Sequence, residues 1–153
     1  MSHKWDRRFL ALAEHVAGWS KDPSTKVGAV LVDNQNIVVG LGYNGFPRGV
    51  EDSDERLNNR DLKLKLVVHA EVNAILMAGE KARGATLYVW PAFGVPSICN
   101  DCAKVVIQAG VAEVVSDNPS QENAERAKRW GDSLTLAKVM CTEAGVTYRA
   151  VHG

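Results

Sequence analysis

The pattern of hydrophobic and polar residues predicts that helices and strands alternate along the chain. Near the start, apolar side chains recur at helical spacing, which is typical of an amphipathic helix that ends around residues 18–20. This stripe consists of Trp5, Phe9, Leu12, Ala13 and Val16. Two apolar runs at residues 27–32 and 37–41, separated by a polar Asp-Asn-Gln-Asn turn, then predict a β-hairpin.

The rest of the chain continues this alternation. Residues 42–49 are rich in turn formers and predict a loop, and the mixed-charge residues 50–64 predict a loop with a short helix near 54–59. The helix that starts at residue 69 is expected to pack through Val72, Ile75, Leu76 and Gly79. Further helices are predicted over 102–109, 120–131 and 134–144, and further strands over 85–90, 111–116 and 146–151. Short links favour parallel pairing of the later strands, so we expect a three-layer α/β/α sandwich with a mixed five-stranded sheet.

Composition narrows the class of protein. The chain has 153 residues, 46% of them hydrophobic, which fits a single domain spanning residues 1–153. Eighteen basic and eighteen acidic residues give zero formal charge, which disfavours binding of polymeric nucleic acid. No run approaches 18 apolar residues and the N-terminus does not resemble a secretory signal, so no membrane association is expected. Three cysteines, two of them close together, do not resemble a disulfide framework and predict a reducing, cytoplasmic location.

Two short motifs indicate metal chemistry. His69 and Glu71 form an H-x-E motif, and Cys99 and Cys102 form a C-x-x-C motif about 30 residues later. One imidazole and two thiolates are the three protein ligands of a catalytic zinc that keeps its fourth position open for water. H-x-E followed by C-x-x-C is the known motif pair of zinc nucleobase deaminases. Zn²⁺ is therefore the expected cofactor, with His69, Cys99 and Cys102 as its ligands.

The spacing of these residues constrains the local structure. Cys99 and Cys102 share one face if a helix begins near Cys99, and a helix N-terminus favours thiolates. His69 and Glu71 are about 200° apart around a regular helix, so they converge on one ion only if His69 lies at the helix start. Glu71 is then the expected catalytic acid–base group: it takes a proton from water, delivers it to the ring nitrogen N3 and later protonates the leaving amine. Trp90, which leads from the third strand toward the metal loop, is a candidate wall of the base pocket.

Other interpretations of the motifs remain open. A C-x-x-C pair alone can be half of a structural zinc site or a redox pair. A closed structural site needs a fourth protein ligand, and Cys141 is the only other cysteine. It lies on the apolar stripe of the last predicted helix, where a buried core position is the simpler interpretation.

Four stretches of the sequence together resemble the deoxycytidylate (dCMP) deaminases of the zinc-dependent cytidine deaminase superfamily. These stretches are Ser-Lys-Asp-Pro-Ser-Thr-Lys-Val-Gly-Ala at 20–29, Gly-Tyr-Asn-Gly-Phe-Pro-Arg-Gly at 42–49, His-Ala-Glu-Val-Asn-Ala-Ile at 69–75, and Cys-Ala-Lys with Ile-Gln-Ala-Gly within 102–110. The metal motifs mark the whole superfamily, whereas the first two stretches indicate the dCMP branch. The resemblance covers most of residues 5–116.

The resemblance implies hydrolysis of dCMP to dUMP and ammonia, with His69, Cys99 and Cys102 holding zinc. It further implies that the Ala70 backbone fixes the pyrimidine edge and that Asn44 reaches the substrate sugar. Many relatives are hexamers that dCTP activates and dTTP inhibits, with the Tyr-Asn-Gly region near the effector. We therefore expect a nucleotide substrate, possible dCTP and dTTP effectors, and a homo-oligomer between dimer and hexamer. A simpler role for Asn44 is a turn residue with positive φ.

The sequence departs from the family in two places. Residues 91–98 intervene before the first cysteine, and residues 117–136 form a longer segment that lacks the family's nearby tyrosine. Phosphate recognition and regulation are therefore the properties that transfer least from the family to this sequence. Arg48 and Lys21 are candidates for phosphate or effector contacts. Further cations in the same region are Arg56, Arg60, Lys63 and Lys65, although five acidic residues share this stretch and a solvated mixed-charge face is the alternative.

Three functional hypotheses follow. The first is a dCMP deaminase, and the second is a deaminase of another substrate such as cytosine, deoxycytidine, guanine or a tRNA base. The third is a non-catalytic zinc domain that senses nucleotides. The neutral charge disfavours tRNA, and the Tyr-Asn-Gly-Phe-Pro stretch favours a nucleotide.

Overall fold

The centre of the molecule is a mixed five-stranded sheet with helices on both faces. The computed structural model describes residues 3–151, and its sheet has the order β2-β1-β3-β4-β5. The antiparallel hairpin β1–β2 joins β3 through a second antiparallel pairing, whereas β3, β4 and β5 run parallel. The strands are β1 (Gly28–Val32), β2 (Val38–Tyr43), β3 (Thr86–Trp90), β4 (Glu113–Asp117) and β5 (Thr147–Val151). The predicted hairpin and parallel strands are confirmed.

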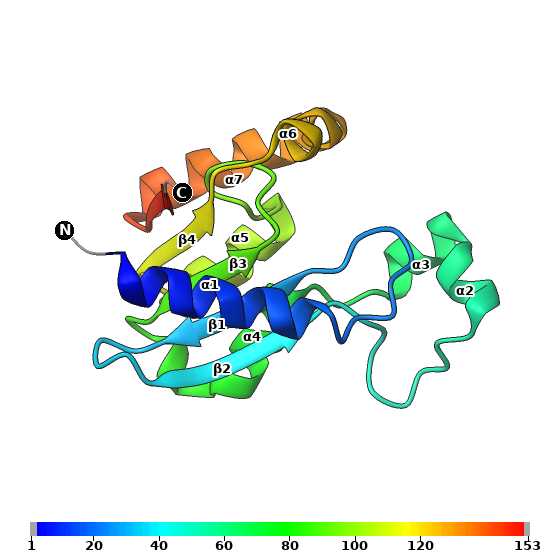
Figure 1. Ribbon diagram of the computed structural model, residues 1–153, viewed down its shortest axis with the longest axis horizontal. Helices are drawn as coiled ribbons and strands as arrows, with labels where there is room; N and C mark the ends of the chain where they lie inside the picture. The colour runs from blue at the N-terminus through cyan, green and yellow to red at the C-terminus, as the bar shows by residue number, and fades with distance from the viewer. Residues whose placement is uncertain (1–2, 152–153) are drawn as a thin grey trace.

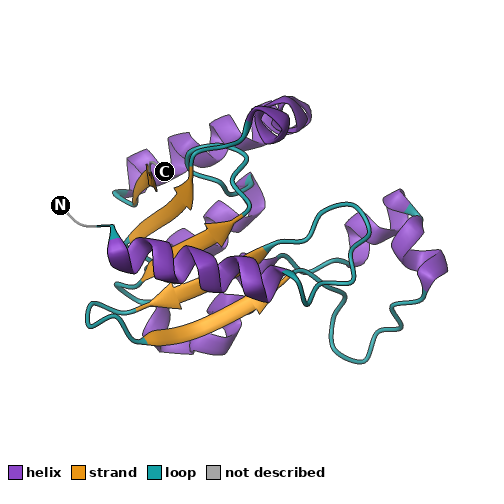
Figure 2. Ribbon diagram, viewed as in Figure 1, coloured by secondary structure: helices purple, strands orange, loops and turns teal. Residues whose placement is uncertain are grey.

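Helices form two outer layers, as Figures 1 and 2 show. Helix α1 (Lys4–Ala17) covers one face, and its Phe9 and Leu10 pack on strand residues that include Val30 and Tyr88. Helices α4 (Ala70–Ala78), α5 (Asn100–Gln108) and α7 (Gly131–Ala144) cover the other face. Each strand contributes side chains to the hydrophobic cores on both faces of the sheet, because successive side chains of a strand point to opposite faces. The predicted three-layer α/β/α sandwich is confirmed.

Small residues let α4 approach the sheet closely. A Cβ on Gly42 would lie 2.6 Å from the Ala70 carbonyl oxygen and 2.6 Å from the Ala74 nitrogen. Ala70 and Ala74 are both fully buried at this contact. Leu76, expected on the packed face, is 72% exposed instead. Alanine and glycine make the contact in its place, because only side chains of this size permit so short a separation between helix and strand.

The segment between β2 and α4 contains more helix than predicted. Helix α2 (Asp54–Asn58) was expected, but α3 (Arg60–Leu66) was not. Each helix has its own N-cap: the Ser53 hydroxyl accepts the Arg56 N–H at 3.3 Å, and the Asn59 side chain accepts the Leu62 N–H at 3.2 Å. In Figure 1 both helices project from the sheet beyond the C-terminal end of α1. A hydrophobic pattern cannot reveal α3, because it is mostly polar and buries a lysine.

The remaining elements connect these layers. A 3₁₀ turn η1 (Gly79–Ala82) follows α4, and helix α6 (Gln121–Ala127) with turn η2 (Lys128–Trp130) leads into α7. Within residues 3–151, no helix has the length and apolar character needed to cross a membrane.

Candidate metal centre and catalytic pocket

His69 occupies the N-cap position of α4. Its backbone is extended, with φ −70° and ψ 154°, so its side chain lies outside the helical rotation that begins at Ala70. Backbone hydrogen bonds between Gly45 and Val68, at 2.7 and 3.1 Å, fix the chain just before this residue. The prediction that His69 lies at the very start of a helix is confirmed, and this position removes the 200° separation between His69 and Glu71.

Cys99 is likewise the N-cap of a helix. It precedes α5 with extended φ and ψ of −78° and 168°, and its Sγ accepts the backbone N–H of Cys102 at 3.4 Å. The Cys102 side chain projects from the first turn of the same helix. The predicted placement of both sulfurs at a helix N-terminus is confirmed, and free N–H groups there stabilise negative charge.

The three potential ligand atoms converge on one point. The ligand atoms of His69, Cys99 and Cys102 all lie within 4.8 Å of one another. His69 Nδ1 is 3.2 Å from Cys102 Sγ and 3.5 Å from Cys99 Sγ. Tetrahedral zinc, with Zn–S of about 2.3 Å and Zn–N of about 2.0 Å, separates nitrogen from sulfur by about 3.5 Å. The donor set and spacing therefore fit Zn²⁺ and leave a fourth position for a non-protein ligand.

Cys141 does not belong to this group. It is fully buried in α7, in the core that includes Val114 and Val146. The interpretation of Cys141 as a core residue is therefore confirmed.

The electrostatics of the cluster favour a cation. A hydrogen bond from the Cys102 thiol, assisted by His69, lowers the pKa of Cys99 to about 4. The hydrogen bond to Cys99 raises the pKa of His69 to about 9, against the opposing effect of burial. The Cys99 thiolate and burial together raise the pKa of Cys102. A metal ion that binds here replaces shared protons, so its affinity falls as the pH falls.

Glu71 lies in the first turn of α4, beside the ligand cluster. Its side chain belongs to the same pocket as His69 and Cys99, and the residue is only 5% exposed. Burial raises the pKa of Glu71, and the charge of His69 only partly offsets this effect. A carboxyl group with a raised pKa beside a metal centre is suited to both accepting and donating a proton near neutral pH.

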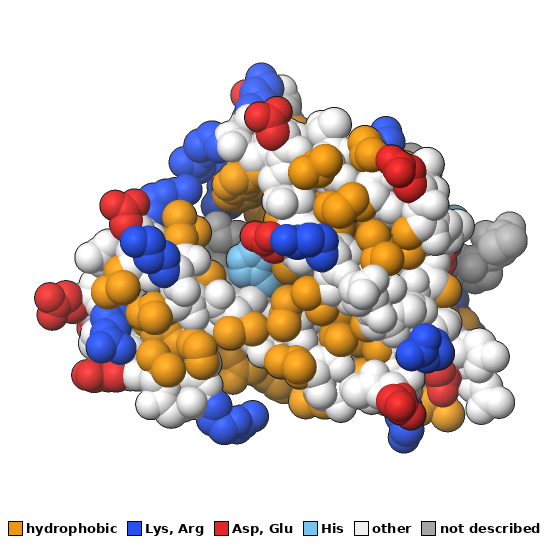
Figure 3. Space-filling view, turned by 180° about the vertical axis from the view of Figure 1, so that it is seen from behind, with side chains coloured by type: hydrophobic (Ala, Val, Ile, Leu, Met, Phe, Trp, Pro, Cys, Tyr) orange, Lys and Arg blue, Asp and Glu red, His pale blue; other side chains and the backbone are white. Residues whose placement is uncertain are grey.

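The ligand cluster opens into a pocket of about 440 Å³. This volume lies in the range of small-molecule sites. Its lining combines the loop 22–27, α3, the starts of α4 and α5, loop 91–98 and the segment 130–134. Figure 3, the view from behind, shows a hollow in the surface with pale-blue histidine atoms inside it and orange hydrophobic atoms around it. Ala70, expected to contact the base through its backbone, lines this pocket.

The Asn44 side chain forms hydrogen bonds with backbone groups of the loop 22–27. Its Oδ1 accepts the Val27 N–H at 2.9 Å, and its Nδ2 donates to the Thr25 carbonyl at 2.9 Å. Its φ is not positive, since Asn36 is the only such non-glycine residue among residues 3–151. The turn interpretation is therefore wrong. Asn44 also lines the pocket, and its Nδ2 lies 3.5 Å from Asp22 Oδ2. These three contacts fix the loop 22–27, which forms one wall of the pocket.

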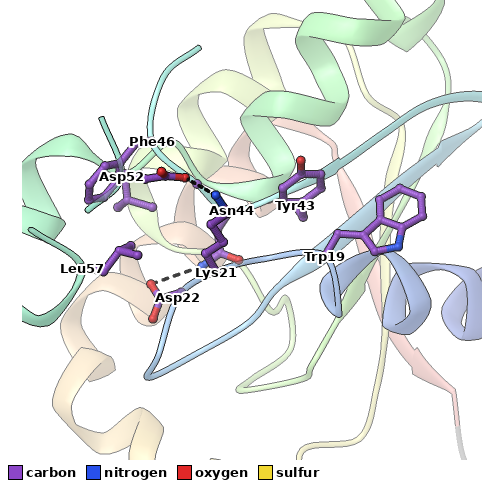
Figure 4. Close-up of a pocket in the computed structure, with 10 residues that line it drawn as sticks. Trp19, Lys21, Asp22, Tyr43, Asn44, Phe46, Asp52 and Leu57 are labelled. Carbon is purple, nitrogen blue, oxygen red and sulfur yellow. Dashed lines mark hydrogen bonds and ion pairs between the residues drawn. The ribbon is translucent and has the colours of Figure 1, made fainter. Parts of the chain in front are cut away.

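A second, smaller pocket of about 190 Å³ shares Asp22 and Asn44 with the catalytic pocket, and Figure 4 shows its lining. Lys21 lines this pocket and forms an ion pair with Asp52 at 3.0 Å. Both of these side chains are largely exposed. Arg48 is exposed and lines neither pocket. Of the two candidates for phosphate or effector contacts, Lys21 therefore lines the smaller pocket, whereas Arg48 lines neither pocket.

Trp90 does not line the catalytic pocket, contrary to expectation. It packs against the core under α1, whereas its neighbour Val89 faces the pocket. The alternation of side chains along β3 is the reason, because adjacent residues of a strand point to opposite faces. Phe93 and Trp130, which the sequence did not single out for the site, line the pocket instead.

Lysine and arginine side chains of α3 also reach the catalytic pocket. Lys63 is 5% exposed and its Nζ lies 3.0 Å from Asp22 Oδ1. Arg60, one turn earlier, is exposed, lines the same pocket and forms no ion pair within residues 3–151. Their i, i+3 spacing after the capping residue Asn59 was the available sequence signal for a shared helix face.

Comparison with known proteins places these features in context. The model of the cytidine and deoxycytidylate deaminase zinc-binding region matches residues 3–117. An uncharacterized deaminase from Aliivibrio fischeri is 38% identical over 95% of this chain and 92% of its own. The human deoxycytidylate deaminase is 36% identical over 95% of this chain and 79% of its own.

Solved structures agree on the fold. The dCMP deaminase of the cyanophage S-TIM5 in complex with dCMP and dUMP has a TM-score of 0.70 and 24% identity. This likeness covers 100% of this chain and 99% of the phage protein. The apo form of the same phage enzyme has a TM-score of 0.61 and 26% identity, over 86% of this chain and 95% of its own.

Proposed function

The chain belongs to the cytidine and deoxycytidylate deaminase zinc-binding family, and from this premise we propose that it hydrolyses dCMP to dUMP and ammonia. The observation that carries the proposal is the convergence of His69 Nδ1 with the Cys99 and Cys102 sulfurs in one pocket with buried Glu71. A closed structural zinc site does not require an acid–base group beside the metal. A hydrolytic site requires one.

The chain's own residues divide the work of the reaction. Bound Zn²⁺ lowers the pKa of coordinated water toward about 7, which supplies hydroxide at neutral pH. Glu71 accepts one proton of the attacking water and transfers it to N3 of the cytosine ring. It then takes the proton of the new C4 hydroxyl group and passes it to the 4-amino group, so that the C4–N bond breaks, ammonia leaves and the C4 carbonyl forms. The buried Ala70 backbone lines the same pocket and is available to orient the edge of the base.

The cations of α3 support a nucleotide as the substrate. Arg60 and Lys63 both line the catalytic pocket. Lys63 is paired with Asp22, whereas Arg60 forms no ion pair with any described residue. The Ser24 and Thr25 N–H groups already donate to Asp22, at 2.8 and 3.0 Å, so the charge of Asp22 is shared among several donors. A 5′-phosphate needs cations or N–H donors at short range, and this wall supplies cations. The deoxycytidylate deaminases among the relatives are consistent with this substrate.

The smaller pocket supports a regulatory role. Lys21, Tyr43 and Asn44 line it, and Asp22 and Asn44 line both pockets. We propose that dCTP and dTTP are its candidate effectors and that the enzyme works as a homo-oligomer. A cytoplasmic location fits as well, because the two ligand thiols must stay reduced to bind zinc.

A substrate panel tests the proposed reaction. The zinc-loaded protein is incubated with dCMP, deoxycytidine, cytosine and guanine, and ammonia release is measured with and without dCTP or dTTP. We expect the highest kcat/KM for dCMP, because only dCMP offers a phosphate to the cationic wall. Turnover of cytosine or guanine without turnover of dCMP would overturn the substrate assignment.

A further inference from the structure

Part of the catalytic pocket comes from outside the region that defines the family. The family match ends at residue 117, whereas Trp130, Ser133 and Leu134 line the pocket from the C-terminal segment. Phe93 joins them from loop 91–98. Phe93 lies inside the matched region, whereas the other three side chains lie beyond it.

An aromatic pair dominates this wall. The rings of Phe93 and Trp130 lie 5.2 Å apart at 88°, in an edge-to-face arrangement. Besides His69, they are the only aromatic side chains among the described residues that line the pocket. Edge-to-face pairs are stable, and one ring keeps a face available for a further planar group.

Phe93 is held in place by its surroundings, and its ring in turn contacts Trp130. The Ser97 hydroxyl accepts the Phe93 N–H at 2.8 Å and donates to the Pro91 carbonyl at 3.3 Å. The Arg126 guanidinium lies over the Phe93 ring, 5.6 Å from its centroid, and donates to the Thr25 hydroxyl at 2.6 Å. Thr25 itself belongs to the pocket lining, so this chain of contacts connects the aromatic pair to the loop 22–27.

The charge and polarity of the side chains that line the pocket indicate which part of a nucleotide Phe93 and Trp130 would contact. Arg60 and Lys63 suit the phosphate, and Glu71 with the metal ligands suits the reacting C4 and N3 atoms. The faces of a flat, uncharged ring need an apolar partner, and an aromatic side chain stacks on any base. Phe93 and Trp130 are the side chains of this kind in the described pocket.

We propose that Trp130, supported by Phe93, contacts the face of the pyrimidine ring and is a specificity-determining residue of the enzyme. This inference rests on the proposed function, because it presumes that dCMP occupies the pocket. It assigns a substrate contact to a segment that the family match does not cover.

Steady-state kinetics give the first test. Trp130→Ala is expected to raise KM for dCMP about tenfold, which corresponds to about 1.4 kcal/mol, with kcat changed less than about threefold. Trp130→Phe should restore most of the binding because it retains a ring. Trp5→Ala is the matched control, since Trp5 is 43% exposed and stacks on Phe9 outside the pocket. An unchanged KM in folded, zinc-loaded Trp130→Ala overturns the proposal.

Tryptophan fluorescence gives a second test that does not depend on turnover. In a Glu71→Gln background, bound dCMP should quench the indole that it contacts. Adding Trp130→Phe should abolish this change, whereas adding Trp5→Phe should leave it. A change that persists without Trp130 overturns the inference while leaving the deaminase function intact. If the wild-type protein neither binds nor deaminates dCMP, the proposed function falls, and this inference falls with it.

Discussion

Lys63 Nζ lies 3.0 Å from Asp22 Oδ1, in an ion pair whose side chains are 7% and 10% exposed. Asp22 borders both pockets, whereas Lys63 borders the catalytic one. Burial alone would raise the pKa of Asp22, but hydrogen bonds from Thr25 and Lys63 hold it below the ordinary value. The pair therefore joins α3 to the loop 22–27 in its charged form.

Breaking this pair is expected to destabilise the fold. Asp22→Asn leaves the Lys63 ammonium buried without a counter-charge, and we expect a loss of about 3 kcal/mol in the free energy of unfolding. The double variant Asp22→Asn/Lys63→Met should recover part of this loss, because it removes the stranded charge. Urea unfolding of the wild type, both single variants and the double variant measures the coupling. Additive effects of the two substitutions would show that the pair contributes nothing.

Arg60 is expected to act on the phosphate alone. Arg60→Ala should raise KM for dCMP about tenfold, because a charge-assisted contact is lost, and should change kcat/KM for deoxycytidine less than about twofold. Stability should not change, since the Arg60 side chain is exposed. Arg48→Ala is the matched control, because Arg48 lines neither pocket. Equal losses with both substrates would rule out recognition of the phosphate by Arg60.

Glu71 is expected to be needed for turnover but not for zinc binding. Glu71→Gln keeps the shape of the side chain and removes its capacity to transfer protons, so kcat should fall at least about 100-fold. Zinc content, measured by atomic absorption, should stay at one ion per chain. His69→Ala is the contrasting variant and should lose both zinc and activity. Loss of zinc from Glu71→Gln would instead indicate a structural role, and unchanged turnover would favour a non-catalytic zinc domain.

Ser133 is expected to support the metal site from outside it. Its hydroxyl accepts the Asn100 N–H at 2.9 Å and donates to Asn100 Oδ1 at 2.7 Å, which fixes the first residue of α5, directly after Cys99. Ser133→Ala should therefore weaken zinc binding about tenfold, the effect typical of groups that orient metal ligands. Competition with a chromogenic chelator measures this affinity.

A control separates this effect from a general loss of stability. Ser53→Ala removes the cap of α2, which lies outside the catalytic pocket, and should cost about 1 kcal/mol in stability without changing zinc affinity. The same chelator titration applies to both variants. If they lose zinc equally, Ser133 has no specific role in positioning the ligands.

Asp6 should make the stability of the fold depend on acid pH. It accepts two hydrogen bonds from Arg149, at 2.8 and 2.9 Å, and one from the Tyr88 hydroxyl at 2.7 Å. Hydrogen bonds from the Arg149 guanidinium are the main cause that lowers the pKa of Asp6 to about 2, below its ordinary value of 3.8. The resulting stabilisation is fully present above the unfolded pKa and is lost as the pH falls through about 2.

Asp6→Asn tests this linkage. We expect a loss of about 2 kcal/mol at pH 7, since Arg149 is partly exposed and its attraction is screened. The difference from wild type should shrink as the pH falls from 4 to 2, and comparing the two proteins cancels their shared loss of zinc. Glu143→Gln, at an exposed position of α7, is the control. A difference that stays constant with pH would contradict the assignment.

The sequence by itself determined the local geometry of the metal site. The spacing of His69 from Glu71 and of Cys99 from Cys102 requires a helix to begin at each motif. In the structure, α4 begins directly after His69 and α5 directly after Cys99. Strand alternation and the short helix–strand links likewise determined the layers and the parallel half of the sheet. These features depend on residues only a few positions apart, whose relative directions follow from the periodicity of helix and strand.

Only the tertiary structure decided which remote side chains share the pocket. Trp90 points away from the catalytic pocket because of its position on β3. Trp130 lines this pocket although it lies in a helical segment about 60 residues after Glu71. Lys63 reaches the site because α3 forms and Asp22 neutralises its charge on burial. The side chains that meet there come from segments far apart in the sequence, so the packing of whole layers sets their positions and no local pattern records it.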